Sequence, residues 1–139
     1  MTQVHLRDDL MGRILARETR YQEQAYVFVL ACIEYLQARL PVRRHVTGQE
    51  LAHAVRDYAL EQFGLLAPAV LQHWGVTQTL DIGRIVYTLV DVELLITQPG
   101  DRIEDFADAY DFGSAFDGWS YVWRGVSGQG GEPRRREVP

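Results

Sequence analysis

The fold depends on residues 73–112, which read HWGVTQTLDIGRIVYTLVDVELLITQPGDRIEDFADAYDF. Apolar residues recur in this stretch at the three-and-four spacing of one buried helix face. They are Ile82, Ile85, Val86, Leu89, Val90 and Leu94. Thr79 can cap this helix, which we expect to run to about Leu95 with the rest of the chain packed against it.

Four upstream segments also predict helices, because apolar residues recur in them at helical spacing and Gly or Pro marks most of their ends. The longest carries apolar residues on more than one face and should be the most buried, with Cys32 as a small hydrophobic group inside it. Thr47 and Glu50 fit a capping box at the start of another. The segments are 6–19, 22–40, 47–63 and 65–74.

The stretch after the long helix allows two interpretations. A hairpin over residues 96–106 around Pro99-Gly100 would make the unit from Leu51 onward resemble a winged helix. Alternatively, Asp101 and Glu104 fit a second capping box that opens another helix. The predicted fold class is therefore mainly α, with about five helices, a helix-turn-helix-like core and a possible small wing-like β-hairpin. The alternative is an α+β winged-helix-like domain.

Length and charge indicate one domain with a tail. The chain has 139 residues and a net charge of −5, which suits a single hydrophobic core over residues 1–124. Residues 101–117 carry one Arg against six carboxylates, a balance of −5, whereas residues 118–139 carry four Arg against two Glu. Residues 125–139 are rich in Gly, Pro and Arg, a composition that predicts a disordered tail.

The sequence contains no signature of catalysis, of a cofactor or of a metal site. Cys32 is the single cysteine, and the four histidines show no paired ligand spacing. Asp105, Asp108 and Asp111 recur every three residues, but a solvated acidic face explains that spacing without a metal. An enzyme is therefore not the favoured interpretation. The absence of a signal peptide or a long apolar run predicts a cytoplasmic protein without a membrane partner.

The long helix does not look like a DNA-reading helix. Its expected exposed face carries one positive charge against three negative ones, whereas binding to DNA phosphates requires Lys or Arg. The residues of that face are Asp81, Arg84, Thr88, Asp91 and Glu93.

These observations favour a non-enzymatic interaction or regulatory module. The expected partner is a protein, or a second copy that covers the aromatic residues of 112–123. The candidate partner surface is the acidic strip of Glu104, Asp105, Asp108 and Asp111.

Two alternatives involve other residues. Nucleic-acid or ribosome association would use Arg39, Arg43 and Arg44 with the arginines of 134–136. An enzyme with an unrecognised pocket between helices would use Arg56, Tyr58 and His73.

Several strings of this sequence resemble a family of small bacterial proteins, known from an acidophilic methanotroph, that has no assigned activity. The resemblance covers about residues 20–117. It implies membership of that family and gives little information about a mechanism. Two departures are Ile82, where the family has an aromatic residue, and Val92-Glu93, where it has a small Ala-Gly pair, so a glycine-type helix stop is not expected there. The strings are RHVTGQEL (44–51), RDYALEQFG (56–64), LQHWGVTQTLDIGRIVYTLV (71–90), DRIEDF (101–106) and YDFGSAF (110–116).

Overall fold

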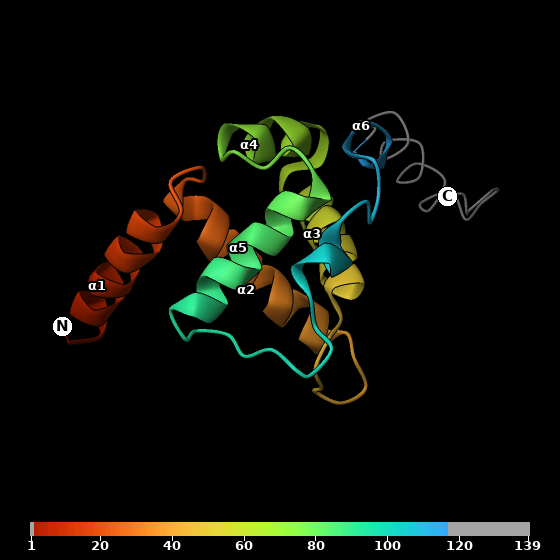
Figure 1. Cartoon of the computed structure of the whole chain (residues 1–139). Helices are drawn as coiled ribbons and strands as arrows, with labels where there is room; N and C mark the ends of the chain where they lie inside the picture. The colour runs from red at the N-terminus through yellow and green to blue at the C-terminus, as the bar shows by residue number, and fades with distance from the viewer. Residues whose placement is uncertain (1, 117–139) are drawn as a thin grey trace.

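Helix α5 lies at the centre of the fold, in contact with α1, α2, α3 and the short helix η2 (Figure 1). The computed structural model describes the backbone of residues 2–116 and the side chains of residues 9–116. The elements are α1 (Thr2–Arg17), α2 (Glu23–Ala38), α3 (Gly48–Phe63), η1 (Gly64–Leu66), α4 (Ala67–His73), α5 (Thr79–Asp91), η2 (Ile103–Phe106) and α6 (Phe112–Ala115).

The apolar stripe of α5 forms the middle of one compact core. Ile82, Ile85 and Leu89 are almost completely buried, while Val86 and Val90 are partly exposed. The prediction of a mainly helical domain with five main helices is therefore confirmed, since α6 is only a short turn of helix. Within residues 2–116, no helix combines the length and apolarity needed to cross a bilayer.

Helix α5 ends at Asp91, earlier than the sequence predicts. Its end has the geometry of a helix stop that usually requires glycine, although no glycine is present there. Glu93 has a positive φ of 68°, and two bonds close the end of the helix. They are Glu93 N–H to Val90 O (2.9 Å) and Leu94 N–H to Leu89 O (2.9 Å). This pattern is a Schellman motif with Glu93 at the position that glycine usually occupies. The stop forms although Val92-Glu93 replaces the Ala-Gly pair of the family that the sequence resembles, and Leu94 lies beyond the helix with 41% of its surface exposed.

Residues 96–106 do not form a wing, because no strand occurs within the described residues. The Asp101 carboxylate closes the Pro99-Gly100 turn by accepting from Gln98 N–H at 2.7 Å. The Asp105 carboxylate then accepts from Arg102 N–H at 3.0 Å and caps η2, one residue later than the predicted box. The hairpin prediction was therefore wrong.

Phe106 anchors η2 between α3 and α5. A Cβ at position 83 would lie 2.9 Å from the Phe106 ring, and one at position 48 would lie 3.0 Å from it. The ring therefore rests on the bare backbone of Gly83 in α5, and a larger residue at that position would displace it. This contact fixes the segment that carries the predicted acidic strip.

Helices α3 and α4 follow the sequence prediction closely. Thr47 Oγ1 accepts from Glu50 N–H at 3.1 Å while the Glu50 carboxylate accepts from Thr47 N–H at 2.9 Å, so the capping box is confirmed. Gly75 ends the α4 region with a φ of 98°, and its α-carbon lies close to the carbonyl of Arg20. The chain can pass there only because glycine has no side chain.

Cys32 is completely buried in α2, as predicted, and burial raises the pKa of its thiol. Three sequence predictions lie outside the described residues. They concern the aromatic segment 119–123, the tail 125–139 and the arginines of 134–136.

Candidate functional site

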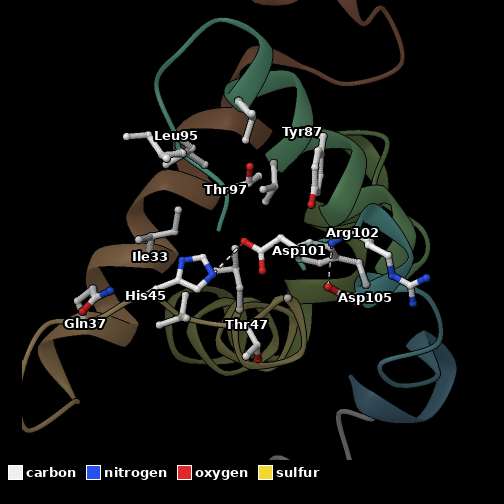
Figure 2. Close-up of a pocket in the computed structure, with 17 residues that line it drawn as sticks. Ile33, Gln37, His45, Thr47, Tyr87, Leu95, Thr97, Asp101, Arg102 and Asp105 are labelled. Carbon is white, nitrogen blue, oxygen red and sulfur yellow. Dashed lines mark hydrogen bonds and ion pairs between the residues drawn. The ribbon is translucent and has the colours of Figure 1, made fainter. Parts of the chain in front are cut away.

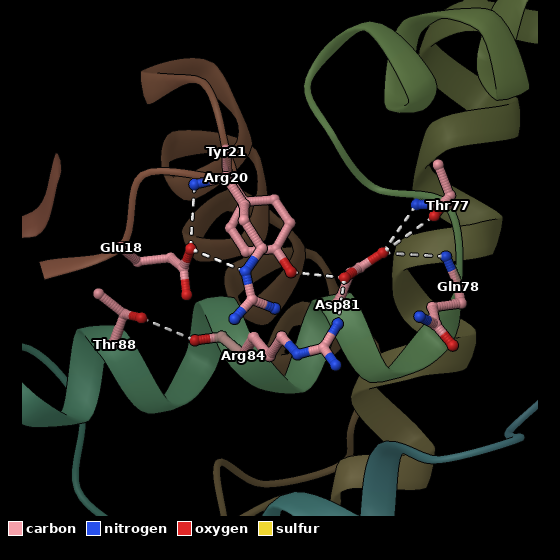
Figure 3. A network of polar contacts seen from close by, with 8 residues as sticks. All are labelled: Glu18, Arg20, Tyr21, Thr77, Gln78, Asp81, Arg84 and Thr88. Atoms are coloured by element: carbon pink, nitrogen blue, oxygen red, sulfur yellow. Dashed lines mark hydrogen bonds and ion pairs between the residues drawn. The ribbon is translucent and has the colours of Figure 1, made fainter.

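A buried carboxylate, Asp81, joins the turn between α1 and α2 to the start of α5 (Figure 3). Its Oδ1 accepts from the Tyr21 hydroxyl at 2.5 Å and from Arg84 Nη1 at 2.8 Å. Its Oδ2 accepts from the backbone N–H of Thr77 at 2.9 Å and of Gln78 at 3.2 Å. Burial would raise the pKa of Asp81, but hydrogen bonds from Tyr21, from two backbone amides and from Arg84 outweigh it, so the pKa lies below its ordinary value.

The position of Asp81 corrects a sequence prediction. Asp81 and Thr88 were expected on the exposed face of the long helix, yet only 4% and 7% of their surfaces are exposed. Tyr21 and the end of α1 cover this side of α5, which a helical wheel alone cannot reveal. The cluster fits a structural role, because both carboxylate oxygens of Asp81 accept several hydrogen bonds and the bond from Tyr21 joins two distant parts of the chain.

The predicted arginine cluster lies on the surface, and each member contacts a carboxylate. Arg43 makes two hydrogen bonds to Glu34, at 3.1 and 3.2 Å, and Arg44 makes two to Glu50, at 3.1 and 2.8 Å. Arg39 stacks on the Tyr35 ring at 3.7 Å and lies 3.8 Å from a carboxylate oxygen of Glu61. Three carboxylates thus balance three guanidinium groups, and the cluster presents no excess of positive charge.

The acidic strip does not form one helical face. Asp105 caps η2, and Asp111 caps α6 by accepting from Ser114 N–H at 3.1 Å. Asp108 has a positive φ of 53° and lies with Asp111 beside a polar hollow, whereas Glu104 is exposed on η2. Two of the four carboxylates are therefore engaged with their own backbone.

Arg56, Tyr58 and His73 do not meet in one pocket. Arg56 pairs with Asp57 at 2.8 Å and lies 5.9 Å from the centre of the Tyr110 ring. Tyr58 faces α2 instead, with its ring 5.4 Å from that of Phe28, and His73 is exposed at the end of α4. The hollow beside Tyr58 is lined mainly by apolar groups.

That hollow is an aromatic groove of about 300 Å³ between α2 and α3. Its rings contact each other closely: Phe28 and Trp74 are 5.4 Å apart, and Phe63 and Trp74 are 5.8 Å apart. Polar side chains occur only at its edge, from Glu23, Gln24 and Gln62. The apolar lining consists of Val27, Phe28, Ala31, Tyr58, Phe63 and Trp74.

A second hollow, which we call the α5 cavity, lies between α2, α3, α5 and the segment that leads into η2 (Figure 2). Its volume is about 160 Å³. His45 and Asp101 both line it and contact each other, with His45 Nε2 3.0 Å from Asp101 Oδ2 (Figure 2). Its apolar lining comes from Ile33, Leu51, Val86, Val90, Leu95 and Phe106.

Sequence reasoning predicted neither the groove nor the α5 cavity, although Tyr58 of the predicted pocket lines the groove. The groove residues carry the apolar periodicity of a core, so no signal separated Phe63 or Trp74 from residues that are fully covered. The histidines showed no paired spacing in the sequence, and the pairing of His45 with Asp101 joins segments far apart in the chain. Among the described residues, no three His, Cys, Asp or Glu side chains converge as metal ligands would.

No protein-family model, no curated protein and no solved structure matches this chain.

Proposed function

We propose that this domain is a protein-interaction module whose aromatic groove binds an amphipathic helix of a partner protein, with basic residues beside the helix's apolar face. The observation that carries the proposal is an apolar groove, lined by aromatic rings, on the surface of the domain. The proposal keeps the protein partner predicted from the sequence and moves the binding surface away from the acidic strip.

The shape of the groove supports a helix as its occupant. Residues of α2 and α3 line the groove with aromatic rings, the type of side chain that most often anchors protein interfaces. The rings of Phe28, Phe63 and Trp74 support one another, so little side-chain freedom would be lost on binding. An amphipathic helix fills such a channel with side chains at positions i, i+3, i+4 and i+7.

Large apolar residues are exposed in the groove and near it in the chain. Val27 lines the groove with 53% of its surface exposed. Leu65 and Leu66 follow Phe63 after Gly64 and are 57% and 66% exposed. A run of large apolar residues at the surface is typical of binding sites on soluble domains.

The charge at the edge of the groove defines the partner further. Glu23 is the only charged residue in the lining, and no cation accompanies it. The chain as a whole is also acidic, with a net charge of −5. Electrostatic complementarity therefore favours a helix with Lys or Arg beside its apolar face.

A peptide selection with two matched valine variants would test this proposal. Peptides enriched from a phage-displayed random library on the full chain would be synthesised, and their affinities would be measured by calorimetry. We expect enriched peptides with helical apolar spacing and basic residues, and a loss of affinity of at least tenfold for Val27→Asp. Val42→Asp is the control, because Val42 is 69% exposed but does not line the groove.

Two results would overturn the proposal. The first is equal peptide affinity for Val27→Asp and Val42→Asp. The second is a concentration-dependent dimer in sedimentation that Val27→Asp dissociates, because the groove would then bind a second copy of the chain. Circular dichroism of both variants checks that the helical fold is retained.

A further inference from the structure

The α5 cavity has the size of a binding site for a small molecule. Its volume of about 160 Å³ is close to that of an apolar protein cavity of about 150 Å³ that binds benzene. Ile33, Leu51 and Phe106 are among the groups that line it, so a ligand with an apolar body would be covered on several sides. Polar groups also line the cavity, among them Tyr87, Thr97 and Asp101.

Oxygen atoms in this polar part of the lining have unused capacity to accept hydrogen bonds. Asp101 Oδ2 accepts from Gln98 N–H and contacts His45, whereas Asp101 Oδ1 has no hydrogen-bond partner among the described residues. The hydroxyl groups of Tyr87 and Thr97 also lack hydrogen-bond partners within that part of the chain. All three residues line the cavity, and their side chains lie around the His45–Asp101 pair (Figure 2).

The lining of the cavity carries two carboxylates, Asp101 and Asp105, against one guanidinium, that of Arg102. Burial raises the pKa of the Tyr87 phenol, and the nearby carboxylates of Asp101, Asp105 and Glu104 raise it further. Arg102 also lines the cavity, but its guanidinium points away from the His45–Asp101 pair (Figure 2). A ligand group at this position would therefore meet acceptors and negative charge.

We infer that the α5 cavity binds a small organic cation, namely a primary ammonium group attached to an apolar body about the size of a benzene ring. The ammonium has three N–H donors, which match Asp101 Oδ1 and the two free hydroxyl oxygens. The apolar body occupies the interior beside Phe106. A carboxylate in the same position would be repelled by Asp101, and a neutral alcohol would lose the charge-assisted hydrogen bond.

Nuclear magnetic resonance titration with three related probes tests this inference. Phenethylamine, phenethyl alcohol and phenylpropionate share an aromatic body but carry positive, neutral and negative ends. We expect saturable shifts of the amide signals of Tyr87, Thr97 and Asp101 with phenethylamine. Binding of the alcohol should be at least tenfold weaker, and phenylpropionate should cause no saturable shift.

Two substitutions that each remove one carboxylate test whether amine binding depends on Asp101 or only on the overall negative charge of the protein. Asp101→Asn should weaken phenethylamine binding at least tenfold and leave the alcohol unaffected. Asp91→Asn removes the same charge from an exposed residue outside the lining and should change affinity less than twofold. Tyr87→Phe, which removes one acceptor without changing a charge, should weaken the amine about threefold.

The same spectra report whether each variant is folded. Equal affinity for the amine and the alcohol would overturn the inference, as would an Asp101→Asn variant that binds the amine like the wild type. Absence of saturable amine shifts in the unsubstituted chain would also overturn it. Because this cavity and the aromatic groove share no residue, each result stands apart from the peptide experiment.

Discussion

Two arginine–carboxylate pairs in this protein have the same length and different surroundings. Arg84 lies 2.8 Å from Asp81, and Arg44 lies 2.8 Å from Glu50. The Asp81 side chain is 6% exposed, whereas that of Glu50 is 36% exposed. Distance alone therefore says little about how much each pair stabilises the fold, because solvent screens the outer pair more strongly than the inner pair, in which the Arg84 side chain is 29% exposed.

The partners of the two carboxylates also differ in their place in the chain. Glu50 binds residues of its own helix cap and the loop just before it. Asp81 binds Tyr21, sixty residues away in sequence, and thereby connects two parts of the fold. The inner pair should determine global stability, and the outer pair should act only locally.

The largest expected effect follows from removal of the inner carboxylate. Asp81→Ala leaves Tyr21, Arg84 and two backbone amides without their common acceptor, and we expect the free energy of unfolding to fall by about 3 kcal/mol. Urea denaturation measures this loss. Asp91→Ala, an exposed site on the same helix, should change it by less than about 0.5 kcal/mol. A similar effect of both substitutions would show that Asp81 is not a global link.

Two buried tyrosines, Tyr21 and Tyr26, allow the effect of a hydrogen bond on stability to be measured apart from the effect of burial. Tyr21 donates to Asp81, while the Tyr26 hydroxyl is fully buried and has no hydrogen-bond partner among the described residues. Tyr21→Phe should lower the free energy of unfolding by about 1.5 kcal/mol, as expected for a hydrogen bond to a charged group. Tyr26→Phe should cause no loss and a gain of up to about 1 kcal/mol, because an unsatisfied buried hydroxyl is removed. Thermal and urea unfolding of both variants would show a reversed order if these assignments are wrong.

Acid titration examines the outer pair. Hydrogen bonds from Arg44 and Thr47 lower the pKa of Glu50 from 4.5 to about 2. A lowered pKa contributes stability that is present above about pH 4.5 and is lost as the pH falls toward 2. Because the side chain is partly exposed, the contribution should be below about 1 kcal/mol. Glu50→Gln should therefore flatten the acid limb of stability against pH, and an unchanged limb would contradict this assignment.

The smallest effect is expected at Arg43, whose pair with Glu34 is solvent-exposed on both sides. Arg43→Ala should leave the urea midpoint unchanged within error at low and at high salt. A salt-dependent loss of stability would indicate that the surface cluster acts as a network. Such a result would make the two regions more alike than their burial suggests.

Sequence patterns predicted those helix ends that are fixed by hydrogen bonds between residues close together in the chain. Thr47 and Glu50 are three residues apart and bind each other, so the start of α3 could be recognised from sequence. Asp81 could not be assigned, because on a helical wheel it belongs with Arg84 and Thr88, and only the distant Tyr21 shows that this face is covered. The same limitation applies to the proposed sites, since the aromatic groove and the α5 cavity each arise from segments far apart in the chain.

Glu93 has a consequence for how this protein can change by mutation. It occupies a left-handed backbone position that suits glycine, and relief of that conformation should raise the free energy of unfolding by about 0.5–1 kcal/mol. Glutamate and glycine codons differ at their middle base, so Glu93→Gly is one nucleotide substitution away. A randomly mutagenised library selected for heat resistance should therefore yield this variant early.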